Sequence, residues 1–169
     1  MSKEFTSLAV LVIDDEPLIR WAVSETLSEV GHKVVEAPDG ASGLWAVTTA
    51  PQAFDLVFLD FRLPDSNDFT LLTAIQRWAP RSVVVLMTAS GTPEVVAEAY
   101  RLGVSRVLNK PFDMAEVHNM VSAASAASRD PREDLHGSTR HQRVPVSLSM
   151  GFDRLGIAAR TVDIRNLPA

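Results

Sequence analysis

Residues 8–17 read Leu-Ala-Val-Leu-Val-Ile-Asp-Asp-Glu-Pro, an apolar run that ends abruptly in three acids and a proline. Two more apolar stretches end in polar residues, since residues 54–59 lead into Asp60 and residues 83–87 lead into Thr88. Short runs rich in Val, Ile and Leu are typical of strands covered on both faces, as in a parallel sheet. The sequence therefore predicts buried parallel strands with polar residues at their ends.

Helical patterns lie between these runs. Pro17 fits the first turn of a helix closed by Gly31, and Asp39 is a candidate N-cap for a helix that Pro51 ends. Two more strands are expected over residues 33–37 and 105–109. Three more helices are expected over residues 69–78, over residues 93–102 and from Asp113 onward, and Asn67 or Asp68 is the candidate cap of the first of these. Five strands alternating with five helices imply right-handed crossovers and helices on both faces of a parallel sheet.

Ligands of such α/β folds gather at the carboxyl ends of the strands. The sequence places Asp14, Asp15, Asp60, Thr88 and Lys110 there. Crowded carboxylates repel one another unless a cation joins them, and their oxygens suit Mg²⁺. Alone, each residue is readily explained as a cap, a solvated acid or a surface charge. Together, the acids, a lysine and a hydroxyl predict a site equipped for phosphoryl transfer.

Composition and charge exclude several other classes of protein. The 169 residues include no Cys, which excludes disulfide frameworks, thiolate metal sites and cysteine nucleophiles. The net charge of −5 argues against non-specific binding of nucleic acid. No apolar run approaches the roughly 18–20 residues of a membrane helix. We therefore expect a cytoplasmic protein with neither a membrane span nor direct DNA binding.

The charge divides the chain into two parts. Residues 1–127 carry 9 Lys and Arg against 16 Asp and Glu, whereas residues 128–169 carry 7 Arg against 5 acids. We expect a folded domain over residues 6–127, followed by a flexible, largely irregular tail over residues 128–169. Forty residues are too few for a typical output domain with its own core, and this tail has no recognisable effector pattern.

Four motifs carry a resemblance to a known family. They are residues 12–17 (Val-Ile-Asp-Asp-Glu-Pro), 59–64 (Leu-Asp-Phe-Arg-Leu-Pro), 87–89 (Met-Thr-Ala) and 110–112 (Lys-Pro-Phe). In this order and spacing, they resemble the receiver domain of bacterial two-component response regulators, over about residues 6–127. The resemblance implies a flavodoxin-like, doubly wound five-stranded sheet with strand order 2-1-3-4-5. It also implies a phosphoacceptor signalling domain rather than an enzyme.

The resemblance assigns a role to each polar residue at the strand ends. Asp60 is the implied phosphoacceptor, and Asp15 is an implied direct ligand of Mg²⁺. Asp14 would bind the ion through water, and Arg62 would offer its backbone carbonyl. The Asp60 carboxylate completes this metal set.

The remaining implied roles concern binding of the phosphoryl group and the change of conformation that follows phosphorylation. Thr88 would hydrogen-bond a phosphoryl oxygen and Lys110 would pair with it, while the Lys110-Pro111 peptide is a candidate for the cis form. The donor would be a histidine kinase or a phosphotransfer protein. Movement of Thr88 would change a face built from the fourth helix, fifth strand and fifth helix, which would contact a downstream protein target or a second copy in a homodimer.

The sequence departs from the family pattern at three places. Val107 stands where the family usually has Phe or Tyr, so a switch based on an aromatic rotamer is in doubt. Asp68 replaces a common Gly in the loop after the acceptor, and this loop is still expected to form. Arg62 and Ser90 occupy positions that influence phosphoryl lifetime in the family. Tyr100 is read as a packing or surface residue rather than as a substitute for the missing aromatic.

Several other side chains have structural explanations. Trp21, Trp45 and Trp78 lie within helical patterns and are expected to cover the sheet faces. His32 and His118 are isolated in the sequence and are expected to lie on the surface or in satisfied positions.

Three alternative functions remain at this point. A flavodoxin-like cofactor binder would need a phosphate-binding loop after the first strand, where residues 14–16 would repel phosphate. A magnesium-dependent aspartyl phosphatase of the haloacid-dehalogenase type would need an Asp-x-Asp pattern there, which residues 14–17 lack. Residues 60–69 also resemble receivers of the nitrogen-regulator class, so the third alternative is the receiver portion of such a transcriptional regulator without its output module.

Overall fold

The structure is a computed structural model that describes residues 7–127. The expectation of an irregular tail over residues 128–169 lies outside the described residues. Within residues 7–127, no helix combines the length and the apolar character needed to cross a membrane.

In the described residues, one sheet of five parallel strands forms the centre of the fold. Its strands follow the order β2-β1-β3-β4-β5, which confirms the predicted doubly wound topology. The strands are β1 (Ala9–Ile13), β2 (Lys33–Ala37), β3 (Leu56–Asp60), β4 (Val83–Thr88) and β5 (Arg106–Asn109). β3 is buried along its whole length, as expected for a central strand covered on both faces.

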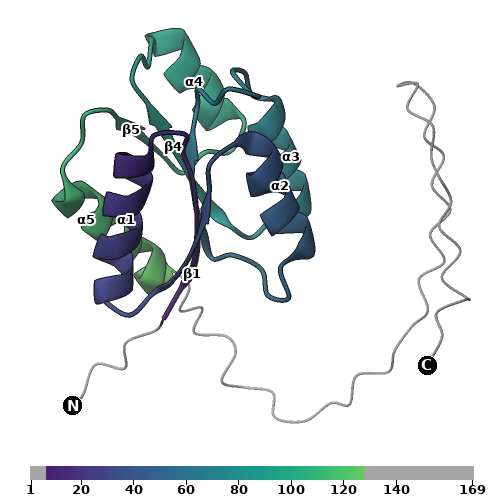
Figure 1. The fold of residues 1–169 in the computed structure, drawn as a ribbon. Helices are drawn as coiled ribbons and strands as arrows, with labels where there is room; N and C mark the ends of the chain where they lie inside the picture. Colours follow the sequence, from purple (N-terminus) through teal and green to yellow (C-terminus); the bar gives the residue numbers. More distant parts are fainter. Residues whose placement is uncertain (1–6, 128–169) are drawn as a thin grey trace, which may run out of the picture. The chain divides into compact units, whose positions relative to one another are not determined.

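The part of the chain that the structure describes has five helices, which cover the two faces of the sheet. They are α1 (Pro17–Glu29), α2 (Gly40–Thr49), α3 (Thr70–Trp78), α4 (Pro93–Arg101) and α5 (Met114–Ala127). Figure 1 shows α1 and α5 on one face and α2, α3 and α4 on the other. Val23 and Val117 belong to the core under α1 and α5, whereas Ile75 and Ala99 belong to the core on the opposite face. The sheet thus has helices on both faces, as predicted.

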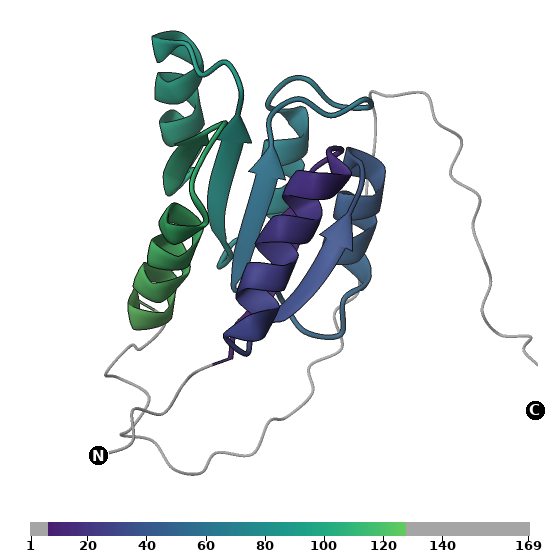
Figure 2. The same cartoon turned by 60° about the vertical axis from the view of Figure 1, so that its left-hand side comes forward.

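The register of the strands brings their carboxyl ends to one edge of the sheet. Ile13 pairs with Leu59 across β1 and β3, and Thr88 pairs with Asn109 across β4 and β5. The arrowheads in Figure 2 point in one direction, toward the edge where the connections to the helices begin. The residues that follow or end these strands therefore share one edge.

The ends of the helices agree with most of the sequence signals. The Asp39 carboxylate accepts a hydrogen bond from Ser42 N at 2.7 Å, so Asp39 caps α2 as predicted. Gly31 and Gly103 follow α1 and α4 with φ of 90°, a backbone conformation that glycine adopts without steric cost. At α3 the prediction was one residue early, because the N-cap position is Phe69. The Asp68 carboxylate still accepts from Thr70 N at 2.8 Å.

The expectation for the three tryptophans was wrong. Trp21, Trp45 and Trp78 are 60%, 69% and 59% exposed, so they do not cover the sheet faces. The positions that face the sheet hold smaller residues, such as Val23 in α1 and Ala46 in α2. A helical pattern places an apolar residue on the helix but does not by itself choose the buried side.

The two histidines agree with the expectation. His32 is buried and its Nδ1 accepts a hydrogen bond from Leu8 N at 3.1 Å, while His118 is exposed. Tyr100 is 49% exposed on α4, which makes it a surface residue.

Candidate functional site

Three carboxylates gather where β1 and β3 end. One oxygen from each of Asp14, Asp15 and Asp60 lies within 4.8 Å of the others. Asp14 and Asp60 are buried, whereas Asp15 is exposed. The predicted convergence of these acids is therefore confirmed, because parallel strands deliver the residues at their carboxyl ends to the same edge.

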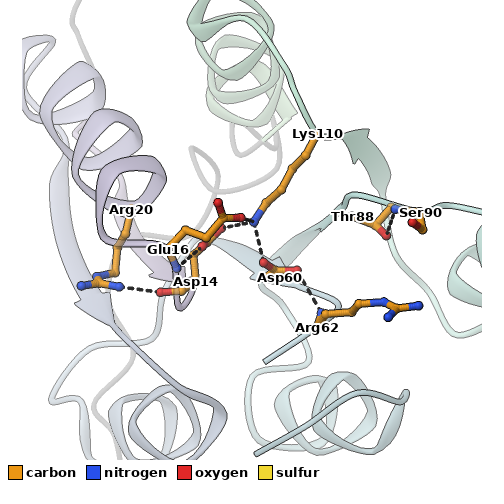
Figure 3. Close-up of polar contacts among 8 residues, drawn as sticks. All are labelled: Asp14, Glu16, Arg20, Asp60, Arg62, Thr88, Ser90 and Lys110. Carbon is orange, nitrogen blue, oxygen red and sulfur yellow. Dashed lines mark hydrogen bonds and ion pairs between the residues drawn. The ribbon is translucent and has the colours of Figure 1, made fainter. Parts of the chain in front are cut away.

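Lys110 brings a cation into this cluster from the end of β5. Its Nζ lies 2.5 Å from Oδ2 of Asp60 and 2.8 Å from Oδ2 of Asp14 (Figure 3). The lysine side chain is only 7% exposed, so little water screens these pairs. The Lys110-Pro111 peptide that follows is cis, as the resemblance implied.

The contacts of the cluster shift the affinity of two groups for protons. Burial raises the pKa of Asp14 above its ordinary value, although the Lys110 ammonium and the N–H of Glu16 oppose this effect. Burial alone would lower the pKa of Lys110, but its bonds to Asp14, Asp60 and Glu16 outweigh burial and raise it. The lysine is therefore permanently charged at neutral pH, and the acids around it outnumber the cation.

The acids fit a hard divalent cation. All three ligand candidates are carboxylates, the donor type that suits Mg²⁺. Oδ2 of Asp14 is buried, and the Lys110 ammonium 2.8 Å away also pairs with Asp60 and Glu16. Three carboxylates share one ammonium and Asp15 adds a fourth negative charge, an excess that a divalent cation would offset. Asp14, Asp15 and Asp60 could hold such an ion.

Arg62 is held next to the acceptor through its backbone. Arg62 N donates to Oδ1 of Asp60 at 2.9 Å, while its side chain extends away from the cluster (Figure 3). The loop that carries it is fastened to the start of α2, because the Asp65 carboxylate accepts from Gly40 N and Ala41 N, both at 2.8 Å. These bonds fix the segment whose carbonyl was predicted to face the metal.

Thr88 ends β4 at the same edge but stands apart from the acids. Its side chain is fully buried, and its hydroxyl oxygen accepts from Ser90 N at 3.2 Å. Among residues 7–127, no hydrogen bond joins the Thr88 side chain to Asp60 or Lys110, and Figure 3 shows it turned toward Ser90. The structure therefore brings Lys110, but not Thr88, into direct contact with Asp60.

Sequence reasoning missed two residues of this site. Oε1 of Glu16 lies 2.8 Å from Lys110 Nζ, although the two residues are 94 positions apart. Arg20 Nη1 donates to the backbone carbonyl of Asp14 at 2.6 Å. The signal for Glu16 was its place in the acidic run after β1. The signal for Arg20 was its position one turn into α1, a helix that starts beside the end of β1.

Comparisons with known proteins agree with this geometry. Residues 10–122 match the family described as the response regulator receiver domain. The DNA-binding transcriptional regulator NtrC of Azospirillum brasilense is 30% identical over 126 residues, which are 75% of this chain and 26% of NtrC. The transcriptional regulatory protein KdpE of Mycobacterium tuberculosis is 36% identical over 115 residues, which are 68% of this chain and 50% of KdpE. A crystal structure of NtrX from Brucella abortus has a TM-score of 0.67 at 33% identity, covering 76% of this chain and 29% of NtrX.

The fold and the acidic cluster define a signalling domain of two-component systems. The chain belongs to the response regulator receiver domain family. It spans about a quarter to a half of the length of the curated relatives named above.

Proposed function

We propose that Asp60 is the phosphoacceptor of a receiver domain that takes its phosphoryl group from a phosphohistidine of a histidine kinase or phosphotransfer protein. The observation that carries the proposal is the contact of 2.5 Å between Lys110 Nζ and Oδ2 of Asp60 inside a cluster of acids. Asp60 is the one member of that cluster on the central strand β3, next to both Asp14 and Lys110.

The chemistry is the transfer of one phosphoryl group between two nucleophiles. A carboxylate oxygen of Asp60 attacks phosphorus, an O–P bond forms, and the P–N bond of the phosphohistidine breaks. The electron pair of that bond stays on the imidazole nitrogen, so no oxidant or reductant takes part. The product is an acyl phosphate, which hydrolysis returns to the free carboxylate.

The residues of the cluster would assist by position and charge. Mg²⁺, when bound by Asp14, Asp15 and Asp60 with the Arg62 carbonyl, would offset negative charge on the phosphoryl oxygens. Lys110 already lies against Asp60 and would pair with a phosphoryl oxygen after transfer.

Thr88 would couple phosphorylation to a change of shape. Its hydroxyl would leave Ser90 and donate to a phosphoryl oxygen, which would draw the connection between β4 and α4 toward Asp60. The face of α4, β5 and α5 would then favour a second conformation. On β5, the partly buried Val107 packs against the core. Its small side chain supports a switch that relies on Thr88 and this connection rather than on an aromatic rotamer.

The same face is our proposed surface for a downstream protein target or for a homodimer. We propose that the chain acts in the cytoplasm as a phosphoacceptor rather than as an enzyme with repeated turnover. The matches to NtrC and NtrX favour one second candidate, in which this receiver is the receiver portion of a nitrogen-regulator-like protein without its output module.

The proposal is tested by incubating the full chain with acetyl phosphate and Mg²⁺ and measuring its intact mass. We expect a single added phosphoryl group that is lost in Asp60→Asn and after chelation of the metal. Release of phosphate at many turnovers per chain, with no accumulated adduct, would instead indicate the phosphatase alternative. An adduct of equal yield in Asp60→Asn would overturn the assignment of Asp60.

A further inference from the structure

Arg20 joins three elements beside the acidic cluster. From α1, its Nη1 donates to the carbonyl oxygen of Asp14 at 2.6 Å, and its Nε donates to Oε2 of Glu36 on β2 at 3.2 Å. The Arg20 side chain is 16% exposed, compared with 42% for Glu36. The guanidinium is therefore largely enclosed and held at two points, through two nitrogens of its planar, rigid set of donors.

The carbonyl that Arg20 contacts belongs to the peptide bond between Asp14 and Asp15, two of the three acids in the predicted metal site. The ladder between β1 and β2 ends with Ile13 opposite Ala37, followed by a bond of 3.1 Å from Asp14 N to Ala37 O. The Asp14 carbonyl lies beyond this ladder, and Arg20 supplies its hydrogen-bond donor. Because a peptide unit is planar, holding its carbonyl oxygen also fixes the direction in which the chain enters Asp15.

Asp14 is thereby held at each of its polar atoms. Its Oδ1 accepts from Glu16 N at 2.8 Å, and its Oδ2 faces Lys110. Asp15 differs, because it is exposed and relies on the backbone for its position. The bond from Arg20 to the Asp14 carbonyl holds the peptide before Asp15, and the bond from Glu16 N to Asp14 Oδ1 holds the backbone after it.

We infer that Arg20 is a positioning residue that orients the Asp14–Asp15 peptide for binding of the divalent cation, with Glu36 neutralising its charge. The inference rests on the proposed function, since it takes the acidic cluster to be a Mg²⁺ site. Glu36 is needed because an unpaired guanidinium beside the cluster would repel the incoming cation.

The direction in which Mg²⁺ affinity changes when Arg20 is removed separates this positioning role from a purely electrostatic one. A positive charge near a cation site weakens binding, so removing Arg20 would tighten Mg²⁺ binding if the residue acted through its charge alone. If Arg20 positions the peptide, removing it weakens Mg²⁺ binding instead. Loss of a group that orients metal ligands typically costs about 10-fold to 100-fold in affinity.

The experiment titrates the full, unphosphorylated chain with MgCl₂ and follows backbone amide chemical shifts. We expect R20M to weaken Mg²⁺ binding about 10-fold and R20K to restore little, because Arg20 uses two separate nitrogens of a rigid guanidinium for its two partners. R101M is the matched control, since Arg101 forms an exposed pair with Glu98 within α4 and should leave Mg²⁺ affinity unchanged. Thermal unfolding without metal checks that each variant is folded.

The single variant E36Q keeps the inference testable if R20M unfolds, and a double-mutant cycle extends the test where R20M is folded. E36Q retains Arg20 but removes its counter-charge, so we expect a smaller loss of Mg²⁺ affinity that disappears in the R20M background. Folded R20M, R20K or E36Q proteins whose Mg²⁺ affinity equals or exceeds that of the unmodified chain would overturn the inference. Failure of the unmodified chain to bind Mg²⁺ would overturn the metal site as well, whereas phosphorylation of Asp60 with Arg20-independent Mg²⁺ affinity would overturn only the role of Arg20.

Discussion

Lys110 Nζ lies 2.5 Å from Oδ2 of Asp60, so its positive charge would compete with a divalent cation for that carboxylate. The same ammonium also faces Asp14 and Glu16, so one lysine contacts three acids. Its contacts therefore bear on stability, on metal affinity and on the fate of the phosphoryl group.

We predict that Lys110→Met destabilises the metal-free chain by about 1–3 kcal/mol, because buried carboxylates lose their partner. The same variant should bind Mg²⁺ at least as tightly as the unmodified chain, since a competing positive charge is gone. Consequently, Mg²⁺ should raise its melting temperature by more. Calorimetry with and without Mg²⁺ measures these effects, and K33M is a matched control because Lys33 is exposed on β2. A 10-fold loss of Mg²⁺ affinity in Lys110→Met would contradict this account of the cluster.

Gly43 allows α2 to approach β1 directly below the acidic cluster. A Cβ at this position would lie 2.5 Å from Cδ1 and 2.9 Å from Cγ1 of Ile13, which is fully buried and precedes Asp14. We predict that Gly43→Ala destabilises the protein by about 1–3 kcal/mol, although alanine favours helices by about 1 kcal/mol. Denaturant unfolding measures the difference, with Thr49→Ala on the exposed side of α2 as the control. A more stable Gly43→Ala protein would show that Ile13 moves aside without cost.

His32 should make stability depend on pH in mildly acidic solution. Burial lowers the pKa of His32 below its ordinary 6.5, and the charge of His118 adds to this effect. The folded state therefore favours neutral His32, whose Nδ1 accepts from Leu8 N. This contribution is present above pH 6.5 and is lost as the pH falls through the folded-state pKa.

The measurement is the melting temperature between about pH 8 and pH 5. We predict a decline on the acidic side that is smaller in His32→Gln, because glutamine takes up no proton. His118→Gln should also reduce the decline, since it removes the neighbouring charge. An unchanged decline in His32→Gln would assign the effect to other groups.

The order of elements and the acidic cluster could be predicted because strands that run parallel all end at the same edge of a sheet. Apolar runs ending in Asp14, Asp60 and Thr88 indicated strands, and the parallel topology then required their ends to meet. No such rule predicted the contacts of Glu16 and Arg20, which depend on how long side chains extend across neighbouring elements. The exposed tryptophans were misread for a related reason, because helical spacing leaves the choice of the buried face to packing.

The central claim is that Asp60 carries the phosphoryl group, and mapping the modified residue tests it most directly. The full chain is phosphorylated with acetyl phosphate and Mg²⁺, and the acyl phosphate is then reduced with borohydride to leave homoserine at the modified aspartate. We predict homoserine at position 60 and unmodified aspartate at positions 14 and 15 in the peptide mass spectra. Homoserine at position 14 or 15 with intact Asp60 would contradict the account.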